Sequence, residues 1–303
     1  MSLTIEQAIA SIPSWRGAPS LAVSLLGGGI TNFNYRVDVD GEPFVVRIWA
    51  KDAGLLGIDR HREHQCTVAA SRTGVGPEVM HFLPDEGILV TRFINGQCLS
   101  VGEQAGPEIM ERVVRSMRRY HAGPAFNGFY SPFRTVEEYL RVARRCGTSL
   151  PDYIDGLHAR MLEIETALQQ ERRIIRPCHN DLWGPNLIDD GNQVRIVDWE
   201  YAGMGDVYFD LADFANYHSA SDAGDRVLLR LYFGDASEIG LARLKLMKIV
   251  AQLREAMWYV AAINLSSAQP DFPAHASTHF DRCRDALNDA RLPSWLDHVA
   301  RGG

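Results

Sequence analysis

The chain of 303 residues divides into two stretches with different hydrophobic patterns. In the first, short β-rich runs at 21–26, 33–39, 44–49 and 87–94 alternate with turns. Asp40-Gly41 is a strong two-residue hairpin signal. One segment, 58–71, has a helical pattern of apolar positions. We therefore predict a small antiparallel sheet with one helix over residues 1–95.

After Asn95-Gly96 the pattern becomes mainly helical. Thr135-Val-Glu-Glu138 has the form of a capping box and predicts a helix that begins there. Further helices are predicted at 107–121, 157–173, 208–218, 239–265 and 275–290. The pattern thus favours an α+β fold with two lobes, a β-rich N-terminal lobe (1–95) and a helical C-terminal lobe (96–303).

The candidate chemistry lies in the second stretch, in Cys178-His-Asn-Asp-Leu-Trp-Gly-Pro-Asn186 and Val194-Arg-Ile-Val-Asp-Trp-Glu200. Asp190-Gly191 separates two short β-rich runs and predicts a hairpin, which would bring Asn186 and Asp198 to neighbouring strand ends. Each residue alone is commonplace in a polar loop or turn. The combination is much more specific.

Phosphoryl transfer from ATP requires such a set of groups. One carboxylate accepts the hydroxyl proton, and an amide oxygen and a second carboxylate bind Mg²⁺. Protein kinases space these groups as H-R-D-x-x-x-x-N followed by a later Asp. Asp181, Asn186 and Asp198 have this order, and we interpret them as catalytic base and metal ligands in a kinase of small molecules, with ATP and Mg²⁺ as cofactors.

The first stretch offers groups for the nucleotide. Backbone N–H groups of Gly27, Gly28 and Gly29 could approach phosphates, with Thr31 and Asn32 directly after them. The glycine run alone is weak evidence, because a flexible hairpin connection is equally compatible with it.

Arg47 stands where a protein kinase has the lysine of Val-Ala-Ile-Lys, and a guanidinium can bind phosphate oxygens with two parallel bonds. An isolated arginine on a strand is more often solvated. The position of Arg47 one hairpin after the glycines favours a functional role, and Glu63 on the next helix is its best partner. Asp210 is expected to accept catalytic-loop N–H bonds or to favour a helix N-terminus.

Composition excludes several classes of function. The chain has 31 basic and 38 acidic residues, a net charge of −7. No basic run appears, so binding to nucleic acid or to an anionic membrane is not expected. The five scattered cysteines form no Cys-x-x-Cys pair, and this suits a reducing cytoplasm. The apolar segment 244–265 contains Lys248, Arg254 and Glu255, which predicts a buried helix and not a membrane span. The oligomeric state is not indicated.

With these residues assembled, the chain resembles the choline/ethanolamine kinase family, within the larger group that includes aminoglycoside phosphotransferases. The resemblance runs from about residue 26 to 290. Its carriers are Gly27-Gly-Gly-Ile-Thr-Asn32, Phe44-Val-Val-Arg-Ile48, residues 59–63, His179-Asn-Asp-Leu182, Asn186 and Ile196-Val-Asp-Trp-Glu-Tyr201. It implies a protein-kinase-like fold, Asp181 as base, Asn186 and Asp198 as Mg²⁺ ligands, and an ion pair between Arg47 and Glu63. Arginine at position 47 is typical of choline kinases, whereas antibiotic kinases usually have lysine.

A quaternary ammonium donates no hydrogen bonds, so aromatic faces and a nearby carboxylate must bind it. Tyr201, Trp258 and Tyr259 are candidate walls, and Glu200 and Glu255 are candidate counter-charges. Trp258 could equally be a core residue of its helix. Animal choline kinases have a second aromatic residue where this chain has Glu255, so the choice between choline and ethanolamine stays open.

Three alternatives remain. A thiamine kinase would share much of the segment around Glu200-Tyr201. An aminoglycoside phosphotransferase would require a broad acidic surface, to which Asp152, Asp155, Asp222 and Asp225 could contribute. A non-catalytic kinase-like binding protein is disfavoured, because such proteins usually lack the base or a metal ligand, and Asp181, Asn186 and Asp198 are all present.

Overall fold

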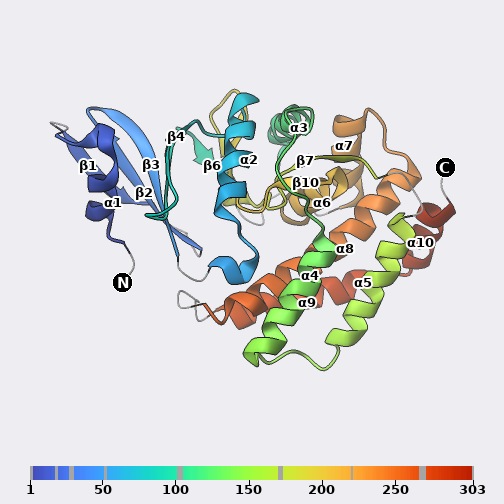
Figure 1. Cartoon of the computed structure of the whole chain (residues 1–303). Helices are drawn as coiled ribbons and strands as arrows, with labels where there is room; N and C mark the ends of the chain where they lie inside the picture. Colours follow the sequence, from blue (N-terminus) through green and yellow to red (C-terminus); the bar gives the residue numbers. More distant parts are fainter. Residues whose placement is uncertain are drawn as a thin grey trace.

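The computed structural model describes residues 3–17, 20–26, 31–50, 53–100, 105–169, 173–219, 221–265 and 271–301. Two lobes lie side by side, a sheet lobe in blue and a helical lobe in green to red (Figure 1). The α+β two-lobed fold predicted from the sequence is thereby confirmed. In these ranges, no helix combines the length and the apolar character needed to cross a membrane.

The N-terminal lobe is a five-stranded antiparallel sheet with the strand order β1-β2-β3-β5-β4. Its strands are β1 (Leu21–Leu25), β2 (Asn32–Val39), β3 (Glu42–Trp49), β4 (Val79–Leu83) and β5 (Ile88–Arg92). Helix α1 (Ile5–Ser11) and Trp15 pack against one face of the sheet. The sequence pattern predicted neither α1 nor β4. In β4 every residue is half-buried, so its apolar positions do not alternate with exposed ones.

The predicted hairpin at Asp40-Gly41 is present between β2 and β3. Asp40 has φ of 52° and Gly41 has φ of 86°. Positive φ at both central residues is what a tight hairpin turn requires, because its twist must match that of the strands. Helix α2 (Arg60–Arg72) follows, with Asp59 as its N-cap.

The C-terminal lobe is built around helix α8 (Glu238–Ala262), most of whose 25 residues are buried. The other helices are α3 (Pro107–His121), α4 (Pro132–Cys146), α5 (Ile154–Gln169), α6 (Val207–His218), α7 (Asp222–Phe233), α9 (Phe272–Leu287) and α10 (Leu292–Arg301). Helices α4, α6, α9 and α10 all pack against α8. Among the helices of this lobe, α7 and α10 were not predicted from the sequence.

The predicted capping box at Thr135 is wrong. Helix α4 begins at Pro132, and Ser131 is its N-cap, with its side chain accepting from the N–H of Arg134. Proline is favoured in the first turn of a helix because its missing N–H would have no partner there. Thr135 instead donates its hydroxyl to the carbonyl of Ser131, one turn back.

Short strands and turns carry the candidate chemistry between the helices. They are β6 (Gln97–Cys98), β7 (Ile175–Cys178), β8 (Leu187–Asp189), β9 (Val194–Ile196) and β10 (Gly203–Asp206), with a 3-10 helix at Gly184–Asn186. Two other 3-10 helices, Pro13–Trp15 and Ala53–Leu56, belong to the N-terminal part of the chain. β8 lies between β6 and β9, and β7 pairs with β10. The sheet of the first lobe therefore ends at Arg92, and Gln97 already pairs with a strand of the second lobe.

Candidate active site

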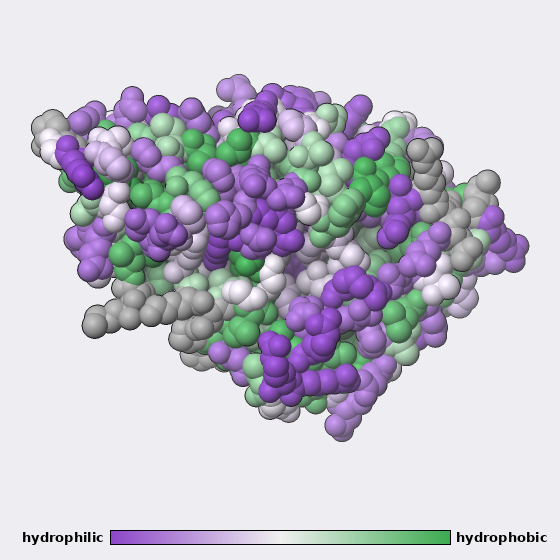
Figure 2. Space-filling model, in the orientation of Figure 1, coloured by the Kyte–Doolittle hydropathy of each residue, from purple (hydrophilic) through white to green (hydrophobic). Residues whose placement is uncertain are grey.

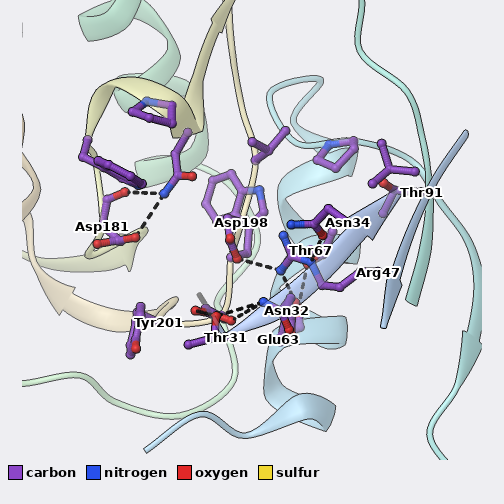
Figure 3. Close-up of a pocket in the computed structure, with 18 of the residues that line it drawn as sticks. Thr31, Asn32, Asn34, Arg47, Glu63, Thr67, Thr91, Asp181, Asp198 and Tyr201 are labelled. Carbon is purple, nitrogen blue, oxygen red and sulfur yellow. Dashed lines mark hydrogen bonds and ion pairs between the residues drawn. The ribbon is translucent and has the colours of Figure 1, made fainter. Parts of the chain in front are cut away.

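A cleft of about 430 Å³ lies between the lobes. Arg47 and Thr91 line it from the sheet, and Asp181, Asp198 and Trp258 line it from the helical lobe. The close-up in Figure 3 shows Asp181 on one side and Arg47 on the other, with Asp198 between them. The volume falls within the usual range for a small-molecule site.

The loop after β7 is bound to helix α6 by its backbone. Asp210 accepts hydrogen bonds from the N–H groups of His179 (2.9 Å) and Asn180 (2.7 Å), and Asp213 accepts from that of Leu182 (2.5 Å). Asn180 has φ of 67°, an unusual value for a residue other than glycine. Such values persist where surrounding contacts over-determine the backbone. Of the two roles expected for Asp210, the structure supports the binding of the loop.

Asp210 is fully buried and receives two further donors, the hydroxyl of Tyr120 (2.6 Å) and Nε2 of His121 (2.9 Å). Burial acts to raise the pKa of Asp210, but the hydrogen bonds from His121 and Tyr120 outweigh it, and the pKa is lowered. Asp210 is therefore a charged acceptor, and the hydrogen bonds it accepts from the N–H groups of His179 and Asn180 hold the loop in place.

Asp181 projects into the cleft. Nδ2 of Asn186 donates to its Oδ2 at 3.0 Å and to its backbone carbonyl at 3.0 Å. The nearest Arg254 nitrogen lies 3.4 Å from Oδ1 of Asp181. Burial raises the pKa of the Asp181 carboxyl, Arg254 opposes this rise, and the carboxylates of Asp213 and Glu255 add to it. A raised pKa makes a carboxylate a better proton acceptor near neutral pH.

The hairpin of β8 and β9 brings Asn186 and Asp198 to neighbouring strand ends, as the sequence predicted. The N–H of Val197 donates to the carbonyl of Asn186 at 3.0 Å. The turn itself is closed by Asp190, whose side chain accepts from the N–H groups of Asn192 and Gln193. Asp198 has φ of 66°, so its backbone too lies in the left-handed region.

Arg47 of β3 forms the expected ion pair with Glu63 of α2, at 2.6 Å. The same nitrogen lies 2.6 Å from Oδ1 of Asp198, and Nε donates to Asn34 at 3.2 Å. Burial acts to lower the pKa of Arg47, but Asp198 and Glu63 raise it further than burial lowers it. The sheet and the β8–β9 hairpin are therefore joined through one guanidinium.

A second network joins the lobes through Glu200. Its carboxylate accepts from Thr31 Oγ1 (2.8 Å) and Asn32 Nδ2 (2.9 Å) and lies 3.1 Å from Arg60. Arg60 also pairs with Glu63 at 2.8 Å. Burial raises the pKa of Glu200 to about 7. Thr31 and Asn32, expected beside the nucleotide, thus use their side chains to bind Glu200, although both also line the cleft.

The expected glycine-rich phosphate contact cannot be compared with the structure. Gly27, Gly28 and Gly29 lie outside the described residues.

The oxygen donors at the hairpin fit Mg²⁺. Magnesium takes oxygen ligands and is usually bound by one or two carboxylates together with phosphates and water. Asn186 turns its Nδ2 toward Asp181, so its Oδ1 is the atom available as a ligand. Asp198 is 23% exposed in the cleft. Glu63, Asp198 and Glu200 also bring carboxylate oxygens within 4.8 Å of one another, with Arg47 and Arg60 as counter-charges.

Aromatic side chains also line the cleft, among them Tyr201, Trp258 and Tyr259. Nε1 of Trp258 donates to the hydroxyl of Tyr201 at 2.7 Å. Trp258 is 8% exposed and packs edge-on against Tyr259 with ring centroids 5.1 Å apart. Trp258 is thus both a core residue and a residue of the cleft wall. Glu255 lines the same cleft, and its Oε2 lies 2.8 Å from Arg254.

Sequence reasoning did not assign Arg60, Asp213 or Arg254 to the site. Arg60 falls inside the 59–63 segment that carried the family resemblance. Arg254 interrupts an otherwise apolar helical segment, and a charge at such a position signals a buried partner. Asp213 lies one turn after Asp210 and therefore on the same face of α6.

The acidic surface proposed for an aminoglycoside is largely absent from the described residues. Asp225 is fully buried and pairs with Lys245 at 2.7 Å. Asp222 pairs with Lys245 and Arg291, and Asp155 pairs with Arg144. Figure 2 shows hydrophilic residues gathered over α4, where Arg134 and Arg141 pair with glutamates of the same helix. Asp155, Asp222 and Asp225 are thus paired with neighbouring cations, and of the four proposed acids Asp152 alone is exposed and makes no ion pair within the described residues.

Comparisons with known proteins give the family. The family model described as choline/ethanolamine kinase matches residues 23–222. A solved structure of a choline/ethanolamine kinase family protein from Mesorhizobium loti has a TM-score of 0.81, 28% identity and 97% coverage of both chains.

Two curated sequences are also similar. Protein LicA of Haemophilus influenzae is 27% identical over 77% of this chain and 70% of its own length. Probable choline kinase 1 of Arabidopsis thaliana is 27% identical over 66% of this chain and 62% of its own. The two-lobed fold, the cleft and the match of the family model to about two thirds of the chain all agree. The chain belongs to the choline/ethanolamine kinase family and is a kinase of small molecules that transfers a phosphoryl group to an alcohol.

Proposed function

We propose that this enzyme transfers the γ-phosphate of ATP to the hydroxyl of choline, with ethanolamine as the second candidate acceptor. The observation that carries this proposal is the position of the Tyr201–Trp258 pair in the same cleft as Asp181. In choline and ethanolamine, two carbons separate the cation from the hydroxyl. When the rings bind the cation, the hydroxyl therefore stays close enough to reach Asp181 in the same cleft.

Asp181 is the general base in this mechanism. As the acceptor oxygen forms its bond to the γ-phosphorus, the bond from phosphorus to the β,γ-bridging oxygen breaks, and ADP leaves with that electron pair. The hydroxyl proton passes to the Asp181 carboxylate. Asn186 donates to the other oxygen of that carboxylate and keeps it oriented.

Asn186 and Asp198 are the proposed magnesium ligands, through an amide oxygen and a carboxylate oxygen. Bound Mg²⁺ would neutralise charge on the phosphate oxygens. Arg47 is oriented by Glu63 and Asn34, and we assign it to the phosphates, where its remaining N–H groups can donate. Glu200, through Thr31, Asn32 and Arg60, joins the two lobes around this site.

Glu200 was a candidate counter-charge for the cation, but its bonds to three N-terminal groups favour this joining role. Glu255 is then the remaining candidate counter-charge for the substrate cation. Its pairing with Arg254 leaves less charge for a substrate cation, which favours recognition by aromatic faces and thus choline. Ethanolamine stays a candidate because its ammonium can donate directly to a carboxylate such as Glu255.

A coupled ADP-release assay with choline, ethanolamine, thiamine and kanamycin tests the proposal. We expect turnover that depends on both ATP and Mg²⁺, with the highest kcat/KM for choline. A higher kcat/KM for ethanolamine would contradict recognition of the cation by the aromatic faces of Tyr201 and Trp258, but not the proposed phosphoryl transfer. Preferential turnover of thiamine or kanamycin would overturn the assignment of the acceptor. Binding of ATP without turnover of any acceptor would favour a binding protein.

A further inference from the structure

Arg254 occupies an unusual place for a charged residue. It lies in the middle of α8, and its side chain is only 2% exposed. A guanidinium does not lose its proton in proteins, so it is buried as a cation. Burying an unpaired ion costs several kcal/mol, and the fold tolerates it only where acceptors compensate. The arrangement of those acceptors therefore indicates what the residue is for.

The shortest contact of Arg254 is with the catalytic loop itself. Nη2 donates to the carbonyl oxygen of Asn180 at 2.5 Å and lies 3.4 Å from Oδ1 of Asp181. Asn180 is the loop residue with left-handed backbone, directly before the proposed base. The same guanidinium lies 3.8 Å from Asp213, which binds the N–H of Leu182 on the other side of Asp181.

Two donors thus bind the two oxygens of the Asp181 carboxylate. Asn186 donates to Oδ2, and Arg254 lies beside Oδ1. The rings of Tyr201 and Phe209 lie 5.9 and 5.6 Å from the guanidinium carbon, close enough to restrict its orientation. A residue present only to neutralise Asp213 would have its shortest polar contact there, and instead that contact is longer than those with Asn180, Glu255 (2.8 Å) and Asp181.

We infer that Arg254 is a positioning residue that sets the orientation of the Asp181 carboxylate from helix α8. The inference rests on the proposed role of Asp181 as base, but not on the identity of the alcohol. Trp258 lies one turn further along the same helix. Helix α8 therefore carries both the proposed cation wall, Trp258, and the group that orients the proposed base, Arg254. The position of the acceptor hydroxyl is thereby fixed relative to the carboxylate that accepts its proton.

The test compares Arg254→Met with Arg243→Met, a matched variant on the same helix. Arg243 is also buried and pairs with Asp206 at 3.2 Å, away from the cleft lining. Assays use whichever alcohol the wild type phosphorylates best. We expect both variants to lose thermal stability, but only Arg254→Met to lose kcat, by about 10²-fold, a loss that a misplacement of about 1 Å can cause. The KM for MgATP should change less than about three-fold, a change worth under ~1 kcal/mol.

Arg254→Lys should recover about ten-fold of the lost kcat, worth ~1.4 kcal/mol, since an ammonium can still donate to Asn180 or Asp181, and should stay about ten-fold below the wild type because it lacks the planar fork of donors. Equal kcat in the folded Arg254→Met and Arg243→Met proteins would overturn the inference, as would a lysine variant no better than methionine. If Arg254→Met does not fold, Arg254→Lys is compared with Arg243→Lys, and equal kcat in that pair overturns it. A wild type without activity on any alcohol contradicts the proposed function instead, and a fully active Asp181→Asn contradicts the base.

Discussion

The two sides of the cleft are built in different ways. The loop at residues 179–186, which carries the proposed base, is a continuous segment whose backbone N–H groups bind two buried acids of α6. The opposite side is assembled from side chains on β2, β3, α2 and the segment after β9, joined by ion pairs such as Arg47–Asp198 and Arg60–Glu200. The loop partners lie about 30 residues apart in sequence, whereas these ion-pair partners lie 151 and 140 residues apart.

The two kinds of construction suit two different tasks, fixing the position of a base and binding phosphates with a metal ion. Backbone hydrogen bonds to a buried acid hold a loop in one conformation, which a base must have before the substrate arrives. Side-chain ion pairs across a cleft can exchange partners when phosphates and a metal ion enter. We therefore expect substitutions in the loop to affect turnover, and those across the cleft to affect nucleotide binding.

The largest effect is expected from Asp181→Asn. The amide keeps the shape and the hydrogen bond from Asn186 but cannot accept the hydroxyl proton, so kcat should fall by about 10²- to 10⁴-fold. MgATP affinity, measured by calorimetry, should stay near that of the wild type. A variant that keeps more than about a third of wild-type kcat would contradict the general-base role.

Asp198→Ala tests the opposite side. Removal of a proposed ligand should weaken Mg²⁺-dependent nucleotide binding by more than the ~10- to 100-fold seen when residues around metal ligands are replaced. Arg47 keeps Glu63 as a partner, so folding should persist. Calorimetry of ATP binding with and without Mg²⁺ measures the effect. Unchanged affinity and activity would show that the hairpin does not bind the metal.

Asp210→Ala tests the support of the loop. Four donors lose a buried charged acceptor, and we expect the free energy of unfolding to fall by about 3–5 kcal/mol together with kcat. Asp225→Ala is the control, because Asp225 is equally buried and pairs with Lys245 and Lys248 away from the cleft. Denaturant unfolding and steady-state kinetics distinguish them. Equal losses of kcat in the two variants would mean that loop support has no catalytic consequence.

The smallest effect is expected from Trp258→Ala. Loss of one aromatic face should cost about 1–2 kcal/mol of cation binding, or roughly ten-fold in the KM for choline. The KM for ATP should not change. Trp295→Ala, which removes a buried tryptophan of α10, controls for lost packing. A choline KM equal to that of the wild type would exclude Trp258 from the cation site.

Local patterns of the sequence predicted much of the loop at 179–186 and of the β8–β9 hairpin beside it. The spacing of Asp181, Asn186 and Asp198, and the turn at Asp190-Gly191, are properties of short segments whose geometry depends on nearby residues. The hairpin at Asp40-Gly41 was predicted for the same reason. The capping box at Thr135 failed although it is local, because Ser131 and Pro132 offered a better helix start just before it.

The partners across the cleft could not be predicted in this way. The Arg47–Glu63 pair was expected by analogy, but nothing in the sequence indicated that Arg47 also contacts Asp198, or that Glu200 binds Thr31 and Asn32. Such pairings depend on how the sheet lobe sits on the helical lobe, which packing of distant segments decides.

The sequence by itself determined the reaction class, since the order and spacing of the proposed base and the two proposed metal ligands lie in one stretch of about twenty residues. Only the tertiary structure decided which charges compensate one another. Arg254 lies 73 residues after Asp181, yet helix α8 brings its guanidinium into the catalytic loop. The physical reason is that backbone geometry limits local spacing, whereas a buried ion takes whatever acceptors the packed core brings within reach.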